Sequence, residues 1–259
     1  TDFSSTPELV AYDVQMASAI TALKGVITDA NANASVAIPE DWLQISGLTM
    51  ADLAKITHGL VARWTAGVAR TPQERGAVNW NDVKSHASQG VPFAPVGDGV
   101  YWWSRTQYYC GVSASWGRSD YKLIGPADKS TGYSSWLGTA VADRKAFTMT
   151  TDDKRLTGAL GADGKQTQGL YAKNEYRTRL IASRGTYHQT NYVFNRTRDY
   201  AVDAGLQGPM HDMTQSELDL LQAEAALRGS DAATAVTLIN KSRVTTGGLS
   251  AATSANDAT

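Results

Sequence analysis

The chain has 259 residues, of which 42% are hydrophobic and only 19% are charged, and its formal net charge is −1. This length suffices for one large domain or two small ones. The near-neutral charge lacks the basic footprint of nucleic-acid-binding proteins, so no nucleic-acid partner is expected. No run of about 18 apolar residues occurs, which argues against a helical membrane span. Few charges combined with many Trp, Tyr, Gly, Ser and Thr are typical of proteins that bind neutral polar ligands outside the cytosol.

Residues 1–90 have the pattern of a helical region. Apolar residues recur at helical spacing, which predicts helices at about 7–29, 49–68 and 79–89. Thr49 is suited to cap the second helix, and Thr71 followed by Pro72 indicates a further helix start. The predicted apolar stripe of the second helix comprises Leu53, Ile56, Leu60, Trp64 and Val68. Residues 38–42 are expected to be extended, because the residue before Pro39 avoids the α region.

The pattern changes between residues 91 and 212, where Gly, Pro, aromatic and polar residues replace the helical periodicity. Short strands are predicted at 147–150 and 190–194, strand-like aromatic pieces at 101–103 and 107–110, and loop elsewhere. A stretch of this length without periodicity is unusual inside a compact domain, and such stretches more often carry function than core. The candidate binding site is therefore expected here.

Aromatic residues gather in this loop-rich region and form the predicted ligand-binding site. Indole and phenol rings stack on the C–H faces of sugars and need little charge to do so. The predicted binding residues are Trp102, Trp103, Tyr108, Tyr109, Trp116, Tyr133 and Trp136. The alternative is that these rings fill a core beneath long loops. Trp102 and Trp103 would face opposite sides of one strand, so at most one of them would line a site.

Residues 213–249 predict a helical hairpin. Thr214 and Glu217 form a capping box, Gly229 ends the first helix, and Asp231 caps the second. Alanines at the close-packing positions give the pair a tetratricopeptide-like character. The expected fold class is therefore mainly α, with tetratricopeptide-like hairpins at 1–90 and 213–249 and a loop-rich insertion with short strands at 91–212.

These helical segments resemble those of the SusD/RagB family. The late hairpin is carried by ELDLLQAEAALR at 217–228, AVTLINKSRV at 235–244 and GGL at 247–249. An earlier helical pair is carried by LVARW at 60–64, ARTPQER at 69–75 and NW at 79–80. The segments occur in the family's order and rough separation, and residues 116–121, 124–128 and 184–188 are similar to some members.

The resemblance implies a non-catalytic surface lipoprotein that captures a glycan or peptide. It also implies delivery of that ligand to a SusC-like TonB-dependent barrel, at the extracellular face of the outer membrane. The family's secretion signal and lipidated cysteine do not occur in these residues, and the chain ends soon after the last hairpin. We therefore expect an internal portion, with one SusD-like domain incomplete at both ends and an anchor implied by the family alone.

The residues themselves carry no catalytic, metal or cofactor signature. His58, His86, His188 and His211 lack metal-ligand spacing, so surface or packing roles are expected. Cys110 is the single cysteine and is expected to be a small buried apolar residue. A glycosidase needs two carboxyl groups at a set separation, which sequence alone does not place. Two alternatives to nutrient binding stay open: a helical-repeat scaffold that binds another protein and, less favoured, a secreted glycoside hydrolase.

Overall fold

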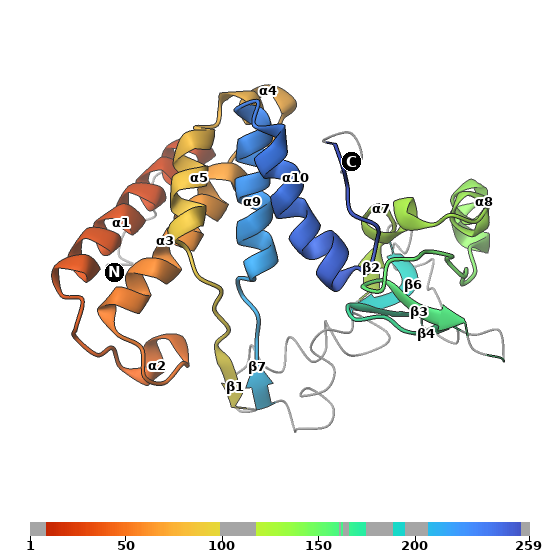
Figure 1. The fold of residues 1–259 in the computed structure, drawn as a ribbon, viewed down its shortest axis with the longest axis horizontal. Coiled ribbons are helices and arrows are strands. Elements are labelled where there is room, and N and C mark those ends of the chain that lie inside the picture. Colours follow the sequence, from red (N-terminus) through yellow and green to blue (C-terminus); the bar gives the residue numbers. More distant parts are fainter. Residues whose placement is uncertain are drawn as a thin grey trace. The chain divides into compact units, whose positions relative to one another are not determined.

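The computed structural model describes residues 9–98, 118–160, 162, 166–174, 189–194 and 207–254. The described part is mainly helical and separates into two compact units (Figure 1). The helical unit contains Thr1–Pro95, His211–Lys241 and Ala252–Thr259, and the inserted unit contains Val96–Met210 and Ser242–Ala251. Segments far apart in the sequence, before residue 96 and after residue 210, thus contribute helices to one unit.

The helical unit is a row of packed helices. Its elements are α1 (Tyr12–Ala32), α2 (Glu40–Leu43), α3 (Met50–Gly67), α4 (Pro72–Ala77), α5 (Trp80–Gln89), α9 (Gln215–Arg228) and α10 (Ala232–Asn240). Figure 1 shows the long helices side by side in the order α1, α3, α5, α9, α10, and each contacts the next. The contact between α5 and α9 joins the two sequence-distant parts.

Polar side chains cap the N-termini of α3, α4, α9 and α10 at the positions that the sequence predicts. The Asp52 carboxylate accepts hydrogen bonds from the Thr49 N–H at 3.1 Å and the Thr49 hydroxyl at 2.8 Å. The Thr71 and Thr214 hydroxyls each accept a backbone N–H three residues ahead, at 3.2 Å. Asp231 does the same for α10 at 3.1 Å. Each cap satisfies a backbone donor that the first helical turn leaves free.

The predicted apolar stripe of α3 is only partly the buried one. Its buried residues are Ala54, Ile56, Thr57, Gly59, Val61, Ala62 and Ala66. Trp64, predicted to face inward, is 45% exposed. Helix α3 contacts α1, α5 and α9. The faces of α3 toward these helices carry mainly small residues, which permit close packing, and the larger Trp64 indole lies partly in solvent.

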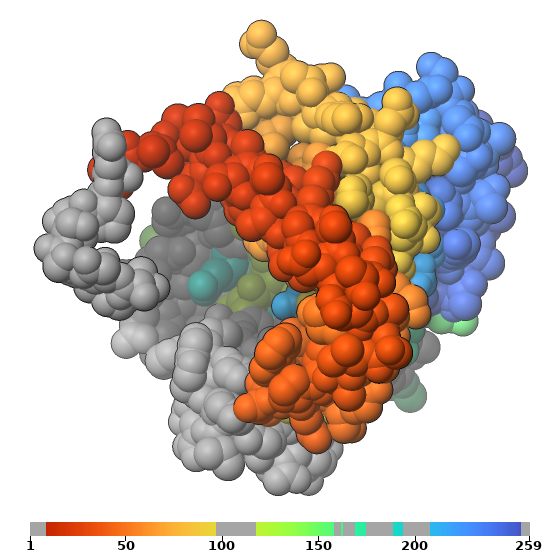
Figure 2. Space-filling view, turned by 90° about the vertical axis from the view of Figure 1, so that its left-hand side faces the viewer, coloured from red at the N-terminus to blue at the C-terminus, as the bar shows by residue number. Residues whose placement is uncertain are grey.

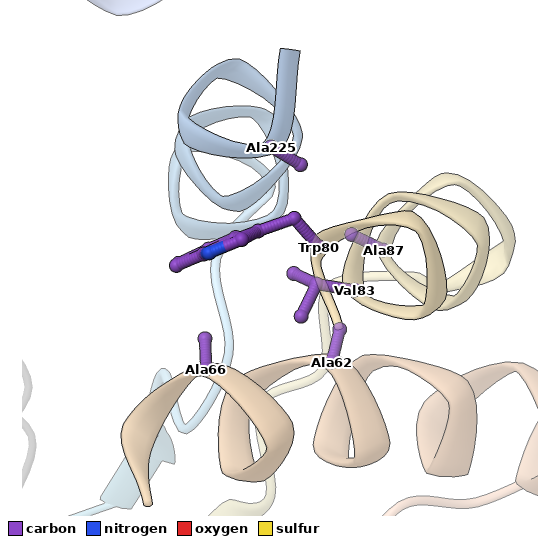
Figure 3. Packing of buried hydrophobic residues seen from close by; sticks show 6 residues of the cluster. All are labelled: Ala62, Ala66, Trp80, Val83, Ala87 and Ala225. Atoms are coloured by element: carbon purple, nitrogen blue, oxygen red, sulfur yellow. The ribbon is translucent and has the colours of Figure 1, made fainter. Parts of the chain in front are cut away.

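One indole fills the space that these small residues leave. Trp80 of α5 extends between Ala66 of α3 and Ala225 of α9, and only 8% of it is exposed (Figure 3). Its Nε1 donates to the Arg75 carbonyl at 3.0 Å. The guanidinium carbons of Arg75 and Arg228 lie 5.1 and 4.8 Å from its ring. Trp80 is therefore the main apolar anchor where α3, α5 and α9 meet.

A charged group also joins α3 to the start of α9. The Arg63 guanidinium donates to both Glu217 carboxylate oxygens, at 2.6 and 2.7 Å, and to Asp212 Oδ1 at 2.7 Å. These hydrogen bonds outweigh the opposing effect of burial and raise the pKa of Arg63. Such a bidentate pair has a fixed geometry and so helps to set the register of the two helices.

The segment predicted as extended at 38–42 contains a short helix. Pro39 itself is extended, as expected for this region, but α2 begins directly after it at Glu40. The prediction was therefore wrong for residues 40–42. Pro39 disfavours the helical conformation in Ile38, but proline is also well tolerated at the start of a helix. Its presence is therefore compatible with an extended segment and with a helix that begins at Glu40.

The inserted unit combines short antiparallel strands with short helices. Its strands are β1 (Val96–Asp98), β2 (Arg118–Asp120), β3 (Thr157–Leu160), β4 (Gln166–Gln168), β5 (Ala172–Asn174), β6 (Gln189–Phe194) and β7 (Gln207–Pro209). They pair as β2-β6-β5, β3-β4 and β1-β7, all antiparallel. Its helical elements are α7 (Tyr121–Ile124), η2 (Gly125–Ala127), α8 (Gly132–Gly138) and η3 (Val141–Asp143), and π-helical η7 (Lys241–Thr246) follows α10.

Two predictions for this region need correction. The strand predicted at 190–194 is confirmed within β6, but residues 147–150 are irregular, and α7 and α8 occur where loop was expected. Asn191 of β6 pairs the backbone of Phe147, accepting its N–H at 3.0 Å and donating to its carbonyl at 2.9 Å. The Tyr192 hydroxyl accepts the Met149 N–H at 2.7 Å. Buried side chains thus take the place of a partner strand.

Candidate functional site

The structure describes two of the seven predicted binding residues. Trp102, Trp103, Tyr108, Tyr109 and Trp116, together with Cys110, lie outside the described residues. Tyr133 and Trp136 both lie on α8, in the inserted unit. The prediction for the other five therefore stays a prediction.

Tyr133 and Trp136 belong to an aromatic cluster. Their rings stack with centroids 6.5 Å apart and planes 22° apart, and Phe147 lies 5.4 Å from Trp136. Trp136 is 4% exposed, whereas Tyr133 is only partly buried. The Arg144 guanidinium carbon lies 4.3 Å from the Trp136 ring. Trp136 thus packs in a core, and Tyr133 is the more exposed of these two predicted binding residues.

Asp128 holds α8 in place beneath this cluster. Its carboxylate accepts the backbone N–H groups of Tyr133 at 2.7 Å, Thr150 at 2.8 Å and Ser130 at 3.0 Å. Burial raises the pKa of Asp128, but these hydrogen bonds outweigh burial and hold the pKa below its usual value. A Cβ at Gly125 would lie 2.2 Å from Tyr133 Cε2, so a larger residue at this position would displace the Tyr133 ring.

The indole N–H of Trp136 is a buried donor with no acceptor among the described residues. Buried polar groups are nearly always hydrogen-bonded to protein or ordered water. An acceptor from water or a ligand would therefore be favoured at this atom.

The helical unit contains a pocket of about 370 Å³. This volume lies within the range of small-molecule sites. The pocket is lined by Tyr12, Asp13, Ile20, Thr65, Val68, Ala69, Glu74, Ala77, Val78 and Asn79. The sequence gives no signal for this pocket, because its walls come from α1, α3 and the α4–α5 segment and contain no recognisable motif.

Polar groups of this pocket are largely engaged with one another. The Tyr12 hydroxyl donates to Glu74 Oε2 at 2.7 Å, and the Arg70 guanidinium carbon lies 3.4 Å from the Tyr12 ring centroid. Hydrogen bonds from the Arg70 N–H and the Tyr12 hydroxyl lower the pKa of Glu74. The same bond to Glu74, with burial, raises the pKa of Tyr12. The buried Thr65 hydroxyl has no hydrogen-bond partner among the described residues.

Two histidines that the sequence assigned to surface or packing roles lie in contact. His58 Nδ1 of α3 and His86 Nδ1 of α5 are 2.8 Å apart. Asp82 Oδ1 lies 3.5 Å from His86 Nε2, and Asp82 Oδ2 accepts from Lys24 Nζ of α1 at 2.8 Å. Burial lowers the pKa of both histidines, and the His86 charge lowers that of His58 further. Both rings are therefore neutral near pH 7.

Metal-ligand groups, membrane-spanning helices and similarity to known proteins give no further indication of function. Within the described ranges, no group of three or more His, Cys, Asp and Glu side chains is arranged to hold a metal ion. In the same part of the chain, no helix has the length and apolarity needed to cross a bilayer. No protein-family model, curated protein or solved structure matches the chain.

Proposed function

We propose that this chain is part of a nutrient-capture protein of the SusD/RagB kind. It would bind a glycan or peptide without catalysis and deliver it to a TonB-dependent barrel at the outer-membrane surface. The observation that carries the proposal is the packing of α3 and α5 against α9, which in turn packs against α10, with the aromatic-rich insertion between α5 and α9 in sequence. Tetratricopeptide-like hairpins interrupted by a loop-rich unit are the arrangement that the family resemblance implies.

The chemistry of the insertion favours a neutral polar ligand. Partly buried Tyr133 lies beside the Trp136 indole, and stacking on such rings needs no formal charge on the ligand. The other predicted aromatics fall within the same stretch of sequence, at positions 102–116. Stacking on such rings suits sugars and aromatic peptides equally, so the ligand class is decided by experiment.

The test is a binding titration with soluble neutral polysaccharides and with mixed oligopeptides, by affinity electrophoresis and calorimetry. We expect saturable binding of one class. Separate Trp102→Ala, Trp103→Ala and Trp116→Ala variants should include at least one that weakens it by about tenfold, the scale of a lost stacking contact. Trp42→Ala is the matched control, because Trp42 lies on α2 and is 62% exposed. Binding unchanged in all three variants would refute the site, and no binding to either class would refute the function.

A scaffold function is the second candidate, supported by exposed apolar side chains just before α1 and in its first turn. Leu9, just before α1, is 97% exposed, and Val10 and Val14 are more than half exposed. Figure 2 shows α1 running across an outer face of the helical unit. Exposed apolar patches are typical of protein contacts. Sedimentation velocity showing a concentration-dependent oligomer, lost on Val14→Lys, with no response to saccharides or peptides, would favour this function.

A further inference from the structure

The histidine pair between α3 and α5 brings together two ring nitrogens of the kind that bind metal ions. His58 Nδ1 and His86 Nδ1 lie 2.8 Å apart, and among the described residues neither nitrogen has another hydrogen-bond partner. Zinc–nitrogen bonds of about 2.0–2.1 Å at a tetrahedral angle place two nitrogens roughly 3.3 Å apart. Binding an ion therefore requires the hydrogen bond between the rings to break, the nitrogens to separate by about half an ångström, and both rings to turn until their lone pairs meet at the ion.

The Asp82 carboxylate lies near the second ring nitrogen of His86, as a carboxylate does in many metal sites. Asp82 Oδ1 is 3.5 Å from His86 Nε2, and Lys24 holds the other carboxylate oxygen. A metal-bound histidine usually donates its second ring N–H to a carboxylate, which fixes the tautomer and raises the basicity of the ligating nitrogen. Asp82 thus favours the tautomer of His86 whose Nδ1 is free to bind.

The backbone sets the spacing of the two helices at this point. A Cβ on Gly90, which ends α5, would lie 2.9 Å from the Gly59 Cα of α3. Gly59 follows His58 directly, and Gly90 is one turn after His86. The two rings are therefore held close by a backbone contact that larger residues would prevent.

From this geometry we infer that His58 and His86 form a two-histidine site for a divalent transition-metal ion of the copper, nickel and zinc class. Imidazole nitrogens select these ions over magnesium and calcium. Because the described residues offer no third ligand of the usual types here, water completes the coordination, and the affinity is that of a weak site. The inference does not depend on the proposed nutrient-binding function.

The experiment uses the tag-free chain, freed of metal with a chelator and titrated calorimetrically with zinc chloride and, in parallel, with magnesium chloride. We expect one zinc ion per chain and no magnesium binding. His58→Ala and His86→Ala should each weaken zinc binding at least tenfold. His211→Ala is the matched control and should leave it unchanged. Asp82→Asn removes no ligand and should weaken it roughly tenfold, as outer-shell partners do.

Side-chain nitrogen NMR of the wild-type chain keeps the test decisive if a variant fails to fold. Zinc should shift the Nδ1 resonances of both His58 and His86, which a purely structural pair would not do. Circular dichroism of each variant reports whether the helices persist, and His58→Gln replaces His58→Ala if they do not. Zinc binding no stronger than magnesium binding, binding that survives loss of both histidines, or coordination through Nε2 would each overturn the inference.

Discussion

The helical unit and the inserted unit satisfy their buried backbone by different means. In the helical unit, helices pair their own backbone groups, so the core can be apolar and built largely from alanines around Trp80. In the inserted unit, irregular residues 147–149 depend on buried Asn191 and Tyr192 for backbone partners. Regular backbone therefore frees the core for close packing, whereas irregular backbone requires polar side chains inside.

The largest expected effect tests the apolar core of the helical unit. Trp80→Ala removes the ring that lies between α3 and α9 and should lower the free energy of unfolding by about 3–5 kcal/mol. Trp64→Ala, on the exposed face of α3, should cost about 1 kcal/mol or less. Denaturant titration followed by far-UV circular dichroism measures both. Equal losses would show that the small-residue interfaces, and not Trp80, determine the stability of this unit.

The second effect tests the polar core of the inserted unit. Asn191→Leu leaves the Phe147 N–H unpaired in a buried site and removes the shorter of the two hydrogen bonds to the Phe147 carbonyl, so it should cost about 2–4 kcal/mol. The exposed Ser135→Ala on α8 should cost about 0.5 kcal/mol or less. Hydrogen exchange with mass spectrometry would localise the loss, with faster exchange expected in peptides that contain residues 147–149. Unchanged exchange there would contradict the assignment of Asn191 as the backbone partner.

A smaller effect tests close approach within the helical unit. A Cβ on Gly59 would lie 2.3 Å from Met213 Sδ, whereas one on Gly67 would meet no described residue within 4 Å. Gly59→Ala should therefore destabilise by about 1–3 kcal/mol through overpacking. Gly67→Ala, at the end of the same helix, should stabilise by about 0.5–1 kcal/mol. Thermal melts compare the two, and a stable Gly59→Ala variant would mean that Met213 moves aside freely.

The smallest effect concerns pH and the histidine pair. The pKa of His58 and of His86 is lowered by burial, so the unfolded chain binds more protons below about pH 6.5 than the folded chain does. Stability should therefore fall as pH falls through that value, with Asp82 and Lys24 as the charged groups facing the pair. Replacing both histidines by leucine should flatten this slope in denaturant titrations at pH 5.5 and 7.5, and His211→Ala should keep it.

The candidate sites were predictable to different degrees. The aromatic composition of residues 101–136 identified Tyr133 and Trp136 as rings of interest, but composition does not separate packing from ligand contact. That distinction depends on the neighbours, and Trp136 is covered by Phe147 and Arg144 from later in the chain. The histidine pair had no sequence signal, because its members are 28 positions apart on different helices.

The sequence by itself determined where the capped helices α3, α4, α9 and α10 begin and that the fold is mainly α. Caps at Thr49, Thr71, Thr214 and Asp231 act over three residues, so their effect is local and can be read from the chain. Only the tertiary structure decided which face of α3 is buried and how residues 147–149 are paired. Those outcomes depend on contacts between residues that are distant in sequence. Local periodicity predicts a helix, but which of its side chains are buried depends on the elements that pack against it.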